Sequence, residues 1–245
     1  MDYVGADADD ILGVGVTVPG ILDDEKQILI SAPPLKAKNY DFTRLISAID
    51  YPVVVMNDAR AEAYADHWFN GKPEDEKIYI MLGEGVGGAY INASAIRNGV
   101  HNRGGEFGHM VIHPGGKQCL CGKKGCFEAY VSEKVLSSEL DMTLDNFFEL
   151  AAQGNKNNSN VLDEYMDNLA LGINNIYTMM DCDIVLGGTV APYLKQYDNS
   201  IKERLVNDYS FDTDADYLRI SDGGGRKSGL GAALSFVARF IDGVE

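Results

Sequence analysis

The sequence contains no apolar run long enough to cross a membrane, and it does not open with the basic and apolar segments of a secretory signal. These two absences predict a cytoplasmic protein without a membrane partner. Basic residues are scarce, with 21 Lys and Arg against 37 Asp and Glu and a net charge of −16. Because phosphate contacts need clustered Lys and Arg, this balance argues against direct nucleic-acid binding by this chain.

Cysteine is also rare, since four residues in a chain of 245 do not make a disulfide scaffold. Three of them fall in GHMVIHPGGKQCLCGKKGCFE (108–128), a glycine-rich stretch with few apolar residues to order it. One imidazole and three thiolates suit tetrahedral zinc, so we predict a structural zinc site with the ligands His109, Cys119, Cys121 and Cys126. Two alternatives stay open: His113 is a rival ligand, and the thiols could be reduced and unligated. Cys182, before a strand, is expected to pack rather than react.

Hydrophobic patterning indicates strands that alternate with helices, and therefore an α/β fold without internal repeats. Strands are expected in 11–20, 51–58, 183–190 and 217–225, and a strand, glycine turn and strand in 77–91. Helices are expected in 41–50, 58–71, 130–153, 160–180, 192–205 and 229–241.

Asn57 and Asp58 stand where a predicted strand ends and a predicted helix begins. In parallel α/β sheets, ligand sites lie beyond the carboxyl ends of the strands. The pair therefore marks a candidate ligand site, although Asp58 also suits a plain helix N-cap.

The stretch GGEFGHMVIHPGGKQCLCGKKGCFEAY closely resembles the signature of the ROK family of bacterial repressors and sugar kinases. Glu106 and His109 form E-x-G-H, the cysteines form C-x-C-G-x-x-G-C, and Glu128 follows shortly after the last cysteine. The resemblance continues, in the family's order and over essentially the whole chain, through VGVTVPG, VVVMNDARAEA, GEGVGGAYI, DIVLGGTV and GLGAALSF.

The resemblance implies an actin-like (RNase H-like) fold with two lobes and a sugar cleft between them. Residues 1–70 would form a partial small N-terminal lobe, residues 71–228 a large C-terminal lobe with the cysteine loop (residues 109–126), and residues 229–245 a helix that returns to the small lobe. Family kinases open with a strand and a D-x-G-G-T turn that this sequence does not contain. We therefore expect an incomplete N-terminal lobe, an uncovered edge on the 11–18 strand and weak or absent ATP binding.

The resemblance also implies roles at the sugar site. Asp58 would be the catalytic base aligned with the γ-phosphate of ATP. The ligands of the sugar would be Gly20, Asn57, Asp58, Glu106, His109 and Glu128. One nitrogen of His109 would bind zinc and the other would face the sugar. The competing interpretations are solvated surface for the two glutamates and a simple turn for Gly20.

The segments that the resemblance assigns to nucleotide binding are rich in glycine. Phosphate would meet the turn GEGVGG (83–88), adenosine would lie near 186–190 and 222–231, and the implied cofactor is Mg-ATP. The implied contacts are Gly83, Gly85, Gly87, Gly187 and Gly188, with ordinary turns as the competing interpretation. Glu84 stands where the family usually has a small hydroxyl residue, and a carboxylate repels phosphate. Three alternatives follow for Glu84: its side chain points away from the phosphate, it binds the magnesium ion, or the chain binds ATP weakly.

Three functions follow from these observations. The first is an ATP-dependent, glucokinase-like hexose kinase. The second is the sugar-sensing effector domain of a ROK transcriptional regulator, and the third is a sugar-binding protein without catalysis. In each of them the partner is a small-molecule sugar, which the sequence does not identify, and a homodimer is expected.

Overall fold

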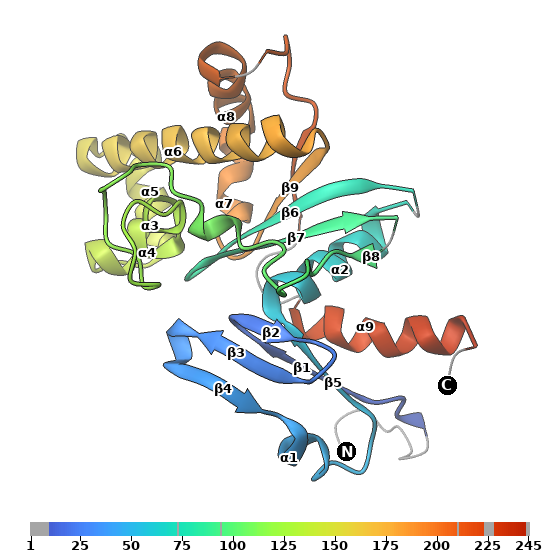
Figure 1. Ribbon diagram of the computed structural model, residues 1–245. Helices are drawn as coiled ribbons and strands as arrows, with labels where there is room; N and C mark the ends of the chain where they lie inside the picture. The colour runs from blue at the N-terminus through green and yellow to red at the C-terminus, as the bar shows by residue number, and fades with distance from the viewer. Residues whose placement is uncertain (1–9, 73, 94, 210, 223–227, 244–245) are drawn as a thin grey trace.

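The computed structural model describes residues 10–72, 74–93, 95–209, 211–222 and 228–243 (Figure 1). A smaller group of strands comes from residues 14–57 and a larger α/β group from residues 76–220, and the helices 58–70 and 228–241 lie between them (Figure 1). Among these residues, no helix combines the length and the apolar character that a membrane span requires. The predicted α/β class is confirmed.

The smaller group contains two sheets. β1 (Val14–Val18) pairs in parallel with β5 (Val53–Asn57), and β1 has no other strand partner within the described residues. β2 (Ile21–Asp23), β3 (Ile28–Ala32) and β4 (Ala37–Asp41) form an antiparallel sheet, with the 3-10 turn η2 (Pro33–Leu35) joining β3 to β4. The short helix α1 (Thr43–Ile46) follows β4. A small core of Val18, Leu22, Leu29, Ala32, Phe42 and Val55 holds the sheets together.

Helix α2 (Asp58–Asn70) leaves the carboxyl end of β5 directly and packs against α9 (Ser228–Ile241). Its buried residues include four alanines, which allow a close approach: a Cβ on Gly231 of α9 would lie 1.7 Å from the carbonyl oxygen of Ala61. Helix α9 also packs on β1, where a Cβ on Gly15 would lie 2.8 Å from Ala232. Small residues in three elements therefore fix the position of α2, which carries Asp58 at its first turn.

The larger group is built on a mixed sheet of order β10-β9-β6-β7-β8. β6 (Glu76–Leu82) pairs antiparallel with β7 (Val86–Asn92) and parallel with β9 (Asp183–Gly187). β10 (Leu218–Ile220) and β8 (Ala95–Ile96) complete the two ends. Alternate apolar side chains of β6 and β9 face a large core that includes Ile78, Ile80, Phe127, Tyr165, Leu169, Ile173 and Ile184.

Helices cover this core, and α6 (Lys156–Met180) is the longest among the described residues. The predicted helix over 160–180 is therefore present. The segment expected to be helical over 130–153 is instead divided into α3 (Glu128–Val131), α4 (Glu133–Leu136), η4 (Ser138–Leu140) and α5 (Leu144–Ala152). Two breaks have a local cause: Ser132 is extended (ψ 159°) and Asp141 is left-handed (φ 53°).

The helix expected over 192–205 is also divided, into α7 (Ala191–Leu194), the 3-10 turn η5 (Lys195–Tyr197) and α8 (Asp198–Arg204), with a π-turn η6 (Leu205–Tyr209) after it. A further 3-10 turn, η3 (Phe107–His109), leads into the cysteine loop. Residues 223–225, at the end of the strand segment expected over 217–225, and the middle of the 222–231 segment lie outside the described residues, as do residues 1–9.

Candidate functional site

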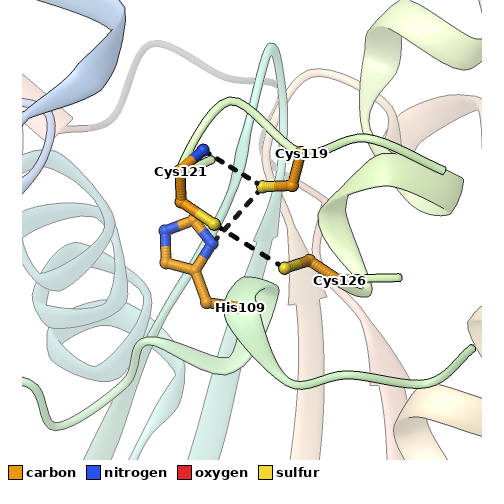
Figure 2. A group of neighbouring side chains, drawn as sticks. All are labelled: His109, Cys119, Cys121 and Cys126. Atoms are coloured by element: carbon orange, nitrogen blue, oxygen red, sulfur yellow. Dashed lines mark hydrogen bonds between the residues drawn. The ribbon is translucent and has the colours of Figure 1, made fainter. Parts of the chain in front are cut away.

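The candidate metal ligands converge at one point of the cysteine loop (Figure 2). One ligand atom from each of His109, Cys119, Cys121 and Cys126 lies within 4.8 Å of all the others. The Sγ atoms of Cys121 and Cys126 are 3.7 Å apart, and Nδ1 of His109 is 3.8 Å from Sγ of Cys119. A tetrahedron with Zn–S bonds of about 2.3 Å has edges of about 3.8 Å. The cluster therefore fits a tetrahedral ion, and its donors suit zinc.

Tight backbone contacts shape the loop around the cluster. Gly125 is left-handed (φ +83°), and a Cβ there would lie 1.8 Å from the carbonyl oxygen of His113. The amide of Cys121 donates a hydrogen bond to Sγ of Cys119 at 3.4 Å. The rival ligand His113 lies elsewhere, because its Nε2 is 2.6 Å from Oδ1 of Asn168 in α6. The geometry thus favours His109 over His113 as the fourth ligand.

The junction of β5 and α2 holds Asn57 and Asp58 in fixed positions. Oδ1 of Asn57 caps α2 by accepting from the Arg60 amide at 2.9 Å, and Nδ2 donates to the Gly20 carbonyl at 3.0 Å. Asp58 is the first helical residue, and its Oδ1 accepts from the Ala59 amide at 2.8 Å. The helix cap is thus Asn57, and the Asp58 carboxylate is left at the wall of a cavity.

Gly20 is required where it stands, because its φ is +104° and a Cβ would lie 2.3 Å from the Ser31 carbonyl oxygen. Its turn joins β1 to β2 and brings the small sheet close to Asn57.

The predicted sugar ligands share a cavity of about 440 Å³ between the two groups of elements. Its wall includes Gly20, Asn57, Asp58, Glu106, His109 and Glu128. Oε2 of Glu106 is 3.7 Å from Nε2 of His109, so the ring nitrogen that faces away from the thiols faces this carboxylate. Residues that are distant in the sequence therefore present three carboxylates, an imidazole and an amide to one space.

Burial changes the acidity of two of these carboxyl groups. It raises the pKa of Asp58 to about 6, with a smaller contribution from the negative charges of Glu62 and Glu106, against the hydrogen bond from the Ala59 amide. Burial also raises the pKa of Glu106, although His109 and Arg60 oppose that change. A carboxyl with a pKa near neutrality is suited to accept a proton during catalysis.

The glycines predicted to contact nucleotide are divided between two places. Gly85, in the turn between β6 and β7, and Gly87, in β7, line the same cavity as Asp58, and so does Glu84. Gly83 belongs to that turn, and its amide donates to the Gly85 carbonyl at 3.0 Å, but it does not line the cavity.

Gly187 and Gly188, at the end of β9, lie outside this cavity. The Gly188 amide donates to Oε1 of the buried Glu62 at 3.0 Å, and the Tyr79 hydroxyl donates to the same oxygen at 3.0 Å. A Cβ on Gly187 would lie 1.7 Å from the Tyr79 hydroxyl oxygen. Packing against Tyr79 accounts for glycine at position 187. A left-handed φ of +84°, with the Leu82 carbonyl oxygen 2.3 Å from a built Cβ, accounts for glycine at position 188.

Arg60 is a functional candidate that the sequence did not indicate. Its side chain is buried, and its guanidinium donates to Oδ2 of Asp24 in the turn between β2 and β3 and to the Asn102 carbonyl, each at 3.0 Å. It therefore ties the small sheet to the segment that leads to Glu106. Its partners are remote in sequence, so no local pattern could identify it. The cavity wall also includes residues that were not predicted: Pro33, Pro34, Leu35, Met81, Leu120 and Lys134.

Comparison with known proteins gives both kinase and repressor relatives. A putative xylose repressor of Caldicellulosiruptor sp. (strain Rt8B.4) is 27% identical over 231 residues, which are 86% of this chain and 58% of the repressor. A glucokinase of Streptomyces coelicolor is 34% identical over 129 residues, which are 52% of this chain and 41% of the glucokinase. The chain spans about half the length of the curated relatives it matches.

Among solved structures, the ROK hexokinase of Thermus thermophilus superposes with a TM-score of 0.73 at 27% identity, over 94% of this chain and 79% of the hexokinase. The fold is therefore that of the actin-like ROK sugar kinases, while the incomplete N-terminal lobe stays a prediction. The profile described as the ROK family matches residues 2–237. This chain belongs to the ROK family.

Proposed function

We propose that this chain is an ATP-dependent hexose kinase, which binds a sugar in the 440 Å³ cavity and transfers the γ-phosphate of ATP to one of its hydroxyls. The observation that carries the proposal is the position of Asp58. Its carboxylate opens the helix that follows a parallel strand and shares one cavity with Glu106, His109 and Glu128. Carboxylates and an imidazole that face one space can accept hydrogen bonds from neighbouring hydroxyls of a sugar ring.

Asp58 would accept the proton of the attacking hydroxyl. Its pKa of about 6 leaves it mainly ionised at pH 7 and still basic enough to take a proton at that point. Asn57 holds the position of this helix turn through its bonds to Gly20 and Arg60. Since phosphoryl transfer depends mostly on alignment, a base fixed by the backbone on both sides suits this reaction.

A structural zinc ion would be held by His109, Cys119, Cys121 and Cys126. It would supply no chemistry to the transfer step, because all four positions are filled by protein ligands. Its contribution would be to order the cysteine loop and to fix His109 with Nε2 toward Glu106.

Bound Mg-ATP would supply the phosphoryl group and a metal ion that neutralises its charge. The backbone at Gly85 and Gly87 is the nearest candidate for phosphate contact, because both residues line the cavity. Gly83, Gly187 and Gly188 stay predictions for that role. Glu84 beside them opposes phosphate binding, and this is the observation against a kinase.

A second candidate function is the sugar-sensing effector domain of a ROK regulator. The xylose repressors favour it, since one of them matches 86% of this chain. The same cavity would bind the sugar in both cases, and DNA contacts would have to come from outside this acidic chain. The lobe boundaries 1–70, 71–228 and 229–245 and the homodimer remain part of the proposal.

The test compares the parent chain with Asp58→Asn, which keeps the size and the hydrogen-bond acceptor of the side chain. Hexose binding is measured by calorimetry, and hexose-dependent ADP release is measured with Mg-ATP. If the chain is a kinase, Asp58→Asn should lower turnover at least about 100-fold, which is the usual contribution of a catalytic base, and should still bind the sugar. The matched control is Asp50→Asn, on an exposed loop residue.

Turnover by the parent that survives in Asp58→Asn would show that Asp58 is not the base. Sugar binding without any ADP release from the parent would favour the effector domain.

A further inference from the structure

A second cavity of about 470 Å³ adjoins the one that contains Asp58. The two share part of their walls, namely Gly20, Pro33, Glu106, His109, Leu120 and Cys121. The second cavity extends between the cysteine loop and the small antiparallel sheet, where its wall includes Ser31, Lys36 and Lys38. Each volume by itself is in the range of about 300–1,000 Å³ that is usual for small-ligand sites. The combined space is larger than one unsubstituted hexose requires.

The two cavities differ in charge. The first is lined by the carboxylates of Asp58, Glu84, Glu106 and Glu128, with Lys134 as its cation. The wall of the second cavity includes Lys36 and Lys38. It also includes the carboxylate of Glu106, which lies where the two cavities meet. Within the described part of the chain, neither lysine forms an ion pair. Two cations without partners beside a ligand cavity stand out in a chain with a net charge of −16.

The backbone fixes where these lysines lie. Lys38 in β4 is the direct cross-strand partner of Ser31 in β3, so a hydroxyl and an ammonium group occupy the same face of the sheet. Lys36 ends the turn η2 in a left-handed conformation (φ 51°), with its amide bonded to the Pro33 carbonyl at 3.1 Å. Lys36 directly precedes β4 and Lys38 lies within it, and both residues line the wall of the second cavity.

We propose that this second cavity binds the anionic substituent of a hexose whose ring occupies the first cavity. The inference rests on the proposed sugar site and extends it to the substrate class: a hexose phosphate or a sugar acid rather than a neutral hexose. Ammonium groups bind phosphate and carboxylate oxygens through charge-assisted hydrogen bonds, and the Ser31 hydroxyl donates a further one. Glu106 and His109, which line both cavities, would contact the ring where it meets the substituent.

The experiment is calorimetry of the full chain with glucose, mannose and galactose, with their 6-phosphates and with glucuronate and galacturonate. We expect an anionic sugar to bind about tenfold or more tightly than its neutral parent, which is the scale of one charge-assisted hydrogen bond. The difference should shrink at high salt, since both lysines are exposed. The 6-phosphates and the uronates separate the two sources of negative charge.

Three variants test the role of the lysines. Lys36→Ala/Lys38→Ala should abolish the preference for the anionic sugar, and Lys36→Arg/Lys38→Arg should retain it. The control Lys26→Ala/Lys156→Ala removes the same charge from residues outside both cavities and should also retain it. Equal affinity for neutral and anionic sugars, or a preference that survives in the double alanine variant, would overturn this inference alone. Absence of binding by every sugar would overturn the proposed function as well.

Discussion

The Glu128 carboxylate accepts a hydrogen bond from the Val86 amide, with 3.1 Å between Oε2 and the nitrogen. Its other oxygen lies 3.4 Å from Sγ of Cys119. A Cβ on Gly85 would lie 2.8 Å from Oε2, so the glycine allows this approach. One side chain thus joins the candidate metal cluster to the turn between β6 and β7, and whatever orders the cysteine loop also holds this turn.

Replacement of Glu128 separates its structural role, as the acceptor of the Val86 amide, from its predicted role in sugar binding. Val86 is buried, and in Glu128→Ala its amide loses its acceptor, which costs about 1–3 kcal/mol of unfolding free energy. Glu128→Gln keeps an acceptor oxygen and should retain most of the stability, but both variants should weaken sugar binding about tenfold or more. Urea unfolding and calorimetry measure the two effects, with the exposed Glu139→Ala as control. Unchanged sugar affinity in Glu128→Ala would remove this residue from the site.

Metal analysis of reductively purified protein should find one zinc ion per chain, because the four candidate ligands already lie within 4.8 Å of one another. Zinc removal by a chelator should lower the melting temperature and the sugar affinity together, since the loop lacks a core of its own. Cys126→Ser should reproduce this result, whereas Cys182→Ser, outside the cluster, should bind zinc normally. Protein without zinc that keeps its melting temperature would contradict the structural role.

The parts of the site that depend on local spacing could be predicted from the sequence. The cysteine cluster lies in a short loop, so close spacing along the chain already placed its thiols near one another. The junction at Asn57 and Asp58 was visible as a β-branched run followed by an alanine-rich one, and it is present as β5 and α2. Glu106 and Glu128 were assigned by motif resemblance alone, and the structure places them on the same cavity.

The parts that depend on distant contacts could not be predicted. The antiparallel sheet of β2, β3 and β4 was missed because β4 reads AKNYD and is largely exposed, without the apolar alternation that marks a half-buried strand. This sheet supplies the wall that carries Lys38. His113 could not be separated from His109 by spacing, because the decisive contact is with Asn168 in a later helix. The glycines at 187 and 188 match a motif, but packing against Tyr79 also explains the first, and a left-handed backbone against Leu82 explains the second.

The raised pKa of Asp58 makes a prediction for pH dependence. The base acts in its ionised form, so kcat/KM should fall about tenfold per pH unit below about 6 and level off above it. The same shift affects stability, because a carboxyl with a raised pKa in the folded state binds protons more readily there than when unfolded. It destabilises the fold progressively from pH 3.8, its ordinary pKa, to about 6.

Asp58→Asn removes that penalty, so at pH 7 it should be at least as stable as the parent, with the difference vanishing as the pH falls toward 4. Urea unfolding at a series of pH values measures this trend. A variant that is less stable than the parent at pH 7 and approaches it in acid would show the opposite sign, and therefore an Asp58 carboxyl whose pKa is lowered by folding.

Glu84 decides how well this chain binds nucleotide. Two unit charges about 4 Å apart interact by roughly 4 kcal/mol at an effective dielectric constant near 20, and exposure of Glu84 to solvent reduces that value. Glu84→Ser should therefore tighten Mg-ATP binding about tenfold relative to a weak or undetectable affinity in the parent. Calorimetry with Mg-ATP, with the exposed Glu74→Ser as control, measures the change. If Glu84→Ser instead weakens binding, and the loss disappears when magnesium is omitted, then the carboxylate contacts the metal ion and favours ATP rather than opposing it.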